Sequence, residues 1–133
     1  MDDIDEQILT LLEHNSRLSN KELGELVHLT GQAVGARILK LQEKGIIRRF
    51  TIERQRQQTQ FIRIFMDNNR FTSFERTVNR FPEVSSLFKV SGQACYMIIA
   101  HFPETQLPVF IEEVSKWARY SVEVVVADKT ELP

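Results

Sequence analysis

Apolar residues recur at the spacing of a helix in the first third of the chain. The first set lies at positions i, i+4, i+7 and i+8: Ile4, Ile8, Leu11 and Leu12. Because this period places all four side chains on one face, it predicts an amphipathic helix over residues 3–14, capped by Asp2 or Asp3.

Two further helices are predicted, each with a recognisable start. Ser19 and Glu22 have the spacing of a capping box, in which each side chain satisfies a free backbone N–H. Thr30 can cap the third helix, and Gly45 can end it in the left-handed conformation. The inward-facing stripes are predicted to be Leu23, Leu26 and Val27 in the second helix, and Val34, Ile38 and Leu41 in the third.

After Gly45 the pattern becomes extended. Residues Ile46–Ile52 are β-branched and partly alternating, which predicts a strand or wing. Residues 53–60 are wholly polar and are predicted to be a linker between an N-terminal domain (1–52) and a C-terminal domain (61–133).

The second half alternates strands with helices. The expected elements, in order, are a strand at Phe61–Met66, a helix carrying Phe71, Phe74, Val78 and Phe81, a strand at Val84–Val90, a turn at 91–93, a strand at Ala94–Phe102, a helix carrying Leu107, Phe110, Ile111, Val114 and Trp117, and a strand at Tyr120–Ala127. This βαββαβ order is the ferredoxin-like arrangement, so the chain is assigned to the α+β class, with a winged helix-turn-helix before it.

The strand Ala94–Phe102 is apolar on both faces. Both helices of a ferredoxin-like fold cover the same face of its sheet, so the other face needs a cover. A second copy of the chain supplies one and predicts a homodimer, or a larger assembly such as an octamer. The alternative is that the linker folds over this face.

Three short helices with tight turns match the helix-turn-helix plan, in which the third helix enters the major groove of double-stranded DNA. Gln32 can offer its amide to a base edge, while Gly35 and Ala36 permit close approach. The complete predicted DNA-binding set is Thr30, Gln32, Ala33, Gly35, Ala36, Arg37, Lys40, Arg48 and Arg49, of which the four cations suit phosphates. The alternative is a module that binds another protein or is only structural.

Charge supports the DNA-binding interpretation. The net charge is only −1, but residues 1–36 contain two basic and seven acidic side chains, whereas residues 37–56 contain seven basic and two acidic ones. A compact basic segment in a near-neutral protein can be a surface for phosphates. It can equally be a solvated helix face.

The sequence lacks the motifs typical of disulfide-bonded proteins, metal-binding proteins, membrane proteins and enzymes. The chain has one cysteine and three histidines without metal-ligand spacing, so neither a disulfide nor a metal site is expected. No apolar run reaches membrane-spanning length and the N-terminus is acidic, so a cytoplasmic protein without a membrane partner is expected. No catalytic constellation or phosphate loop stands out, so neither an enzyme nor a cofactor is expected.

At this level of detail the chain resembles the leucine-responsive regulatory protein (Lrp/AsnC, or feast/famine) family of transcription regulators. The matching stretches are Asp2-x-x-Asp5-x-x-Ile8-Leu9-x-x-Leu12, Asn15-Ser16-Arg17-Leu18-Ser19-x-x-Glu22-Leu23 and Leu29-Thr30-x-x-Ala33-Val34-x-x-Arg37-Ile38-x-x-Leu41-x-x-x-Gly45-Ile46-Ile47. The resemblance implies a C-terminal domain that assembles dimers, often into octamers, and commonly binds amino acids.

Two positions depart from the family pattern. Thr30-Gly31 stands where a Ser-Pro pair is usual, and Cys95 stands where many members carry an acidic residue near the effector. The resemblance places effector contacts at Ser91, Gly92, Gln93, Ala94, Cys95 and Tyr96. Without a carboxylate at position 95, weak or absent amino-acid binding is expected. The turn is similar to that of LrpC-like members, which implies DNA bending without an effector as an alternative function.

Two further alternatives involve chemistry. The chain is similar in fold to siroheme decarboxylases, but those enzymes carry a histidine in the second strand of this domain, and Val84–Val90 has none; His101 ends the next strand. Cys95 could be a nucleophile or redox sensor, although its neighbours Ala94 and Tyr96 offer nothing that would lower the pKa of its thiol.

Overall fold

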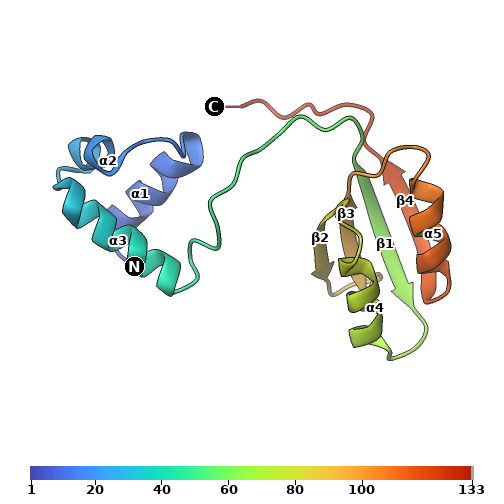
Figure 1. Cartoon of the computed structure of the whole chain (residues 1–133). Coiled ribbons are helices and arrows are strands. Elements are labelled where there is room, and N and C mark those ends of the chain that lie inside the picture. Colours follow the sequence, from blue (N-terminus) through green and yellow to red (C-terminus); the bar gives the residue numbers. More distant parts are fainter. Residues whose placement is uncertain (133) are drawn as a thin grey trace. The chain divides into compact units, whose positions relative to one another are not determined.

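The N-terminal part is a unit of three helices. In the computed structural model, which describes residues 1–132, these are α1 (Asp3–His14), α2 (Asn20–Val27) and α3 (Gly31–Glu43) (Figure 1). Their shared core is formed by residues from all three helices: Ile8, Leu23, Val27 and Val34. Burial of these apolar side chains holds together helices that would be marginal in isolation.

The helix ends follow the predicted caps. Asp2 begins α1 in a capping box with Asp5, and Ser19 begins α2 in a second box with Glu22. The Thr30 hydroxyl accepts a hydrogen bond from the N–H of Ala33 at 3.1 Å and begins α3. Gly45, with φ of 74°, follows the end of α3 as predicted.

The turn between α2 and α3 depends on a close backbone approach at Gly24. The Leu29 N–H donates to the Gly24 carbonyl at 2.9 Å, and His28 holds a left-handed φ of 62° to bring the chain round. A Cβ at position 24 would lie 2.3 Å from the Leu29 carbonyl oxygen, so only glycine fits. Leu26, predicted to face inward, is 54% exposed, because the buried side of this short helix is formed by Leu23, Gly24 and Val27.

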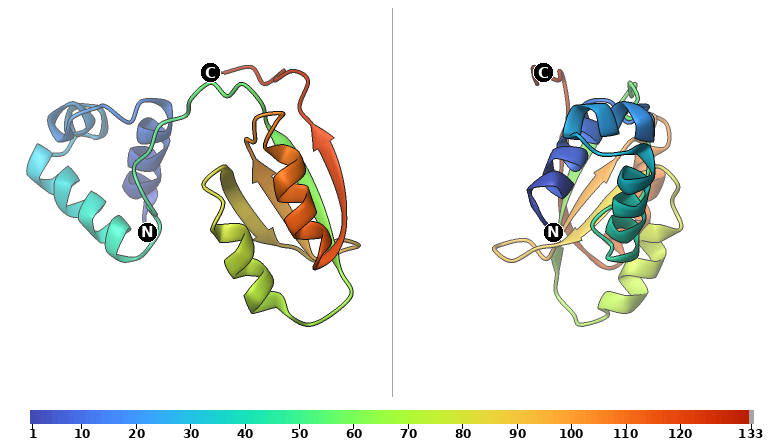
Figure 2. Two further views of the ribbon diagram at one scale, coloured as in Figure 1. Left: turned by 45° about the vertical axis from the view of Figure 1, so that its right-hand side comes forward. Right: turned by 90° about the vertical axis from the view of Figure 1, so that its left-hand side faces the viewer.

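The C-terminal part is a four-stranded antiparallel sheet with two helices. The elements are β1 (Gln60–Met66), α4 (Phe71–Asn79), β2 (Val84–Lys89), β3 (Tyr96–Ala100), α5 (Leu107–Ser115) and β4 (Ala118–Val124). The strand order is β2-β3-β1-β4, and both helices lie on one face of the sheet (Figure 2). The predicted βαββαβ order is confirmed.

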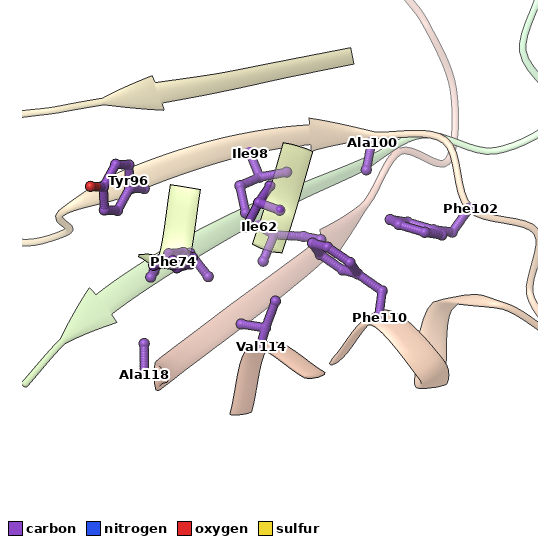
Figure 3. Packing of buried hydrophobic residues seen from close by; sticks show 11 residues of the cluster. Ile62, Phe74, Tyr96, Ile98, Ala100, Phe102, Phe110, Val114 and Ala118 are labelled. Atoms are coloured by element: carbon purple, nitrogen blue, oxygen red, sulfur yellow. The ribbon is translucent and has the colours of Figure 1, made fainter. Parts of the chain in front are cut away.

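The core of this unit lies between the sheet and its helices (Figure 3). Ile62 on β1 and Ile98 on β3 are fully buried there. At one end the rings of Phe102 and Phe110 stack with centroids 4.6 Å apart, and at the other Phe74 packs against Tyr96 at 5.1 Å. The core of this unit therefore has aliphatic side chains in its middle and aromatic pairs at its two ends.

The opposite face of the sheet is open. Register places Phe61 opposite Ile99 and Phe88 opposite Met97 on this face. The side chains of Phe61 and Phe88 are 40% and 50% exposed, and Met97 and Ile99 are only partly buried. The open face thus presents exposed or partly buried apolar side chains on β1, β2 and β3 beside the Arg63–Glu123 ion pair.

Several predicted boundaries are wrong. Residues Ile46–Ile52 form no strand in the described chain; the N–H groups of Ile46 and Ile47 instead donate to the Leu41 carbonyl and close the end of α3. A strand needs a neighbour, and the polar residues that follow provide none. β3 is shorter than the predicted Ala94–Phe102, and β4 begins at Ala118 rather than Tyr120.

The chain divides into two compact units, Met1–Glu53 and Arg54–Glu131.

Candidate nucleic-acid interface

The outward surface of α3 carries most of the predicted DNA-binding residues. Gln32, Ala36 and Lys40 are exposed, and Ala33 is partly buried. Leu39 lies on the same side of the helix and is 56% exposed. Thr30 is exposed as well, although its hydroxyl accepts the helix-cap hydrogen bond from the Ala33 N–H. The outward surface of α3 therefore offers one amide, one ammonium group, the leucine side chain and small side chains.

Gly35 has a different neighbour from the one expected. It is partly buried, and a Cβ there would lie 3.0 Å from Nδ2 of Asn20, at the start of α2. The small size of this residue thus serves the contact between α2 and α3. Its predicted role in close approach to a groove is not needed to explain why glycine stands here.

Arg37 is held by α1. Its Nη1 donates to both carboxylate oxygens of Asp2 at 2.8 Å and to Oδ1 of Asp5 at 3.2 Å. These contacts lower the pKa of Asp2 to about 2 and raise the pKa of Arg37 above its ordinary value. In this structure two carboxylates already contact the guanidinium group of Arg37, and phosphate binding by Arg37 stays a prediction.

The other predicted cations are available. Lys40, Arg48 and Arg49 are exposed, and within residues 1–132 none of them is part of an ion pair. Lys40 and Lys44 line a shallow hollow beside the Arg37 ion pairs. Positive charge on this unit is therefore free on the last turns of α3 and on the segment that follows it.

The predicted effector turn connects β2 to β3. Gly92 adopts φ of 133°, and Ser91, Gly92 and Gln93 are exposed. The backbone of Cys95 is used by the fold, because its N–H donates to the Ile64 carbonyl at 2.8 Å and its carbonyl accepts from Val90 at 3.0 Å. Its free thiol is partly buried. Unpaired backbone donors in this turn are thus confined to its tip.

Tyr96 does not belong to the exposed part of the turn. It is 1% exposed and points under α4, where its hydroxyl donates a hydrogen bond to Glu75. Burial, followed by the adjacent Glu75 carboxylate, raises the pKa of this phenol. The carboxylate of Glu75, which the sequence pattern did not single out, is engaged by this contact.

His101 lies at the end of the sheet where the linker enters. Its Nε2 contacts the Ser85 hydroxyl and its Nδ1 contacts the Thr59 hydroxyl, both at 3.0 Å. Burial, followed by the charges of Arg56 and Arg54, lowers the pKa of this imidazole. In the described part of the chain, no three His, Cys, Asp or Glu residues are grouped as a metal site requires. No helix there has the length and apolarity to span a membrane.

Comparison with known families gives two matches in the order of the two units. The AsnC-type helix-turn-helix domain matches residues 1–42, and the Lrp/AsnC ligand binding domain matches residues 59–127. The HTH-type transcriptional regulators LrpA and LrpB of Bacillus subtilis are each 35% identical to the chain. The LrpA match covers 95% of this chain and 98% of that protein, and the LrpB match covers 92% and 86%.

Solved structures agree with the fold. The structure of LrpC from Bacillus subtilis superposes with a TM-score of 0.87 at 25% identity, covering 98% of this chain and 97% of that one. A transcriptional regulator of Neisseria meningitidis in complex with L-methionine has a TM-score of 0.83 at 24% identity, covering 99% and 94%. LrpC is thus a close structural neighbour, although LrpA and LrpB share more identical residues with the chain.

Proposed function

The chain belongs to the Lrp/AsnC family of transcriptional regulators, and from this premise we propose that it binds double-stranded DNA with α3 in the major groove. The supporting observation is the exposed surface of α3, on which Gln32 and Ala36 stand clear of the core. A glutamine amide can bond to adenine on both its N6 and N7 edges, and an alanine methyl group can contact thymine. These two residues are assigned to base contacts, with Ala33 beside them.

Phosphate contacts are assigned to Lys40, Arg48 and Arg49. All three are exposed, and each can release one condensed counterion when it meets a phosphate. Arg37 is left out of this set because Asp2 and Asp5 hold it. Contacts to phosphates position the protein, whereas contacts to bases choose the sequence.

Two copies of the chain are proposed to pair through the open face of the sheet. Phe61 and Phe88 are exposed there beside Met97 and Ile99, and burying this face would remove apolar area from water. A dimer presents two copies of α3, which explains how a small helix-turn-helix unit can achieve useful affinity on a two-part site. Larger assemblies up to an octamer remain part of this proposal.

The turn at residues 91–95 is proposed to form the site of any effector, through backbone N–H groups at its tip and the Gln93 side chain. Such groups can hold a carboxylate. An amino acid also carries an ammonium group, and Cys95 offers it no charge partner. Because an unpaired buried charge costs several kcal/mol, we expect amino-acid binding to be weak or absent, with DNA binding or bending by the oligomer as the working activity.

One experiment tests the assignment of α3. Genomic fragments bound by the protein would be mapped with and without amino acids, and the best-bound duplex would be titrated by fluorescence anisotropy at several salt concentrations. Lys40→Ala should weaken binding and reduce the slope of log K against log salt by about 0.9, the value for one lost phosphate contact. Lys129→Ala, in the exposed C-terminal segment, is the matched control and should change neither quantity. An unchanged isotherm for folded Lys40→Ala would contradict the assignment.

A further inference from the structure

We propose that Asp2 and Asp5, through Arg37, position the recognition helix α3 for sequence-specific DNA binding without contacting the DNA themselves. This inference rests on the proposed function, because it concerns how α3 is held when it reads a duplex. It assigns a role in recognition to two acidic residues at the start of the chain, a type of residue that a DNA-binding surface normally excludes.

The geometry concentrates three contacts on one atom. Arg37 Nη1 lies 2.8 Å from both oxygens of Asp2 and 3.2 Å from Oδ1 of Asp5. The acids are themselves locked together, since the Asp5 N–H donates to Asp2 Oδ1 at 2.9 Å and the Asp2 N–H donates to Asp5 Oδ2 at 3.2 Å. The two acids that form the capping box of α1 therefore also bind Arg37 of α3.

The ion pairs of Arg37 with the two acids are directional, whereas the apolar packing of the core is not. Among polar side-chain contacts in residues 1–53, only those of Arg37 join two different helices. The remaining contact between the helices is packing of side chains such as Ile8 and Val34, which is non-directional. A charged hydrogen-bonded pair resists rotation of α3 about its own axis, and such a rotation would move Gln32 and Ala36 away from their base edges.

Burial supports a fixed arrangement over a mobile surface pair. The side chain of Arg37 is 30% exposed and that of Asp5 is 16% exposed, whereas Asp2 is 56% exposed. The low pKa of Asp2 keeps its carboxylate charged at any pH at which the protein would work. All the contacts of Arg37 with the two acids are made by Nη1, so a phosphate that took this atom would have to displace both carboxylates.

Removing the negative charges of the two acids changes DNA affinity in opposite directions under the two hypotheses, that the acids position α3 or that they only restrain a phosphate ligand. The double variant D2N/D5N removes two negative charges near an anionic ligand, and asparagine retains the oxygen that each cap needs. If only the net charge mattered, or if the acids only kept Arg37 from binding a DNA phosphate, D2N/D5N would bind every duplex more tightly. If the acids position α3, D2N/D5N loses affinity for the preferred duplex despite the gain in positive charge.

The test uses the full-length chain, the best-bound genomic duplex and a scrambled duplex of the same composition, at a temperature where thermal melts show each variant to be folded. We expect D2N/D5N to weaken binding of the preferred duplex on the order of tenfold, within the range of coupled networks, and to leave scrambled-duplex binding equal or tighter. R37M should likewise weaken binding of the preferred duplex, without changing the salt slope, and adding R37M to D2N/D5N should cost little more. R37K should retain part of the preference, because a single ammonium group can reach the place of Nη1.

Lys40→Ala is the control for a true phosphate ligand on the same helix and should reduce the salt slope by about 0.9. Tighter binding of both duplexes by D2N/D5N, or a reduced slope for R37M, would overturn the inference while leaving the proposed function intact. Changes in melting temperature without a change in preference would overturn it as well, since the role would then be only structural. A wild-type protein that prefers no duplex would overturn both.

Discussion

Gln60 and Phe102 form a paired hydrogen bond inside the C-terminal unit. The Gln60 side-chain Nε2 donates to the Phe102 carbonyl and its Oε1 accepts from the Phe102 N–H, each at 2.9 Å. Gln60 is fully buried and Phe102 is 1% exposed. This side-chain amide therefore takes the place of a backbone partner just after the end of β3. It links the start of β1 to that segment.

Gln60→Leu should destabilise the protein by about 3 kcal/mol, because each buried backbone group left without a partner costs roughly 1–3 kcal/mol. Urea unfolding at fixed protein concentration measures the change. Gln57→Leu, at an exposed linker position, is the matched control and should be close to neutral. Equal stability of the two variants would show that the Gln60 pair contributes nothing.

Gly24→Ala should lower stability by about 1–3 kcal/mol, the usual range for forcing a methyl group into a packed site, and should weaken DNA binding. The reason is that the new Cβ would lie 2.3 Å from the Leu29 carbonyl oxygen and push α2 from α3. Gly31→Ala is the control, since its Cβ would be in ordinary contact, 3.4 Å from the Lys21 nitrogen. Thermal melts and anisotropy titrations of the two variants check the contrast; similar behaviour would be incompatible with the close approach at Gly24.

Phe61→Lys should dissociate the oligomer, because it replaces an exposed aromatic ring of the open sheet face with a charged side chain and so removes apolar area that pairing would bury. Light scattering on the full-length chain should give a dimer or larger species for the wild type and a smaller species for the variant. Val126→Lys is the control: Val126 is 97% exposed and lies beyond β4. A wild-type monomer at micromolar concentration would exclude pairing through this face.

Calorimetry against the twenty amino acids should give no tight, saturable signal for the wild type. The physical reason is the missing carboxylate at position 95, which leaves an α-ammonium group without a charge partner. A micromolar site for any amino acid would contradict this expectation. Cys95→Asp should then be titrated with the same ligand, to establish whether an added carboxylate strengthens or abolishes the signal.

Stability of the C-terminal unit should fall as the pH falls below neutrality. Burial and the charges of Arg56 and Arg54 lower the pKa of His101 in the folded state, so below its unfolded pKa the unfolded chain binds more protons and folding weakens. The contribution is complete above the unfolded pKa and is lost as the pH falls through the folded one. His101→Gln should flatten this dependence in urea unfolding between pH 7 and pH 5, whereas His14→Gln should preserve it. The same slope in both variants would assign the dependence to other groups.

Local chemistry in the sequence was sufficient for much of the fold. The capping box of Ser19 and Glu22, the Thr30 cap and the Gly45 stop involve neighbours a few residues apart, so they operate before any tertiary contact forms. The alternation of strand and helix periods likewise predicted βαββαβ. The exposure of Gln32 and Lys40, which belong to the proposed interface, followed from the helical period of the buried stripe.

Tertiary structure decided what depends on residues far apart in the chain. Arg37 and Asp2 are 35 positions apart and Tyr96 and Glu75 are 21 apart, and no local pattern signals either pair. Residues Ile46–Ile52 have the composition of a strand but lack a neighbouring strand in the described chain. The physical reason is the same in each case: a side chain's charge or β propensity is a local property, but the partner that satisfies it is set by how helices and strands pack.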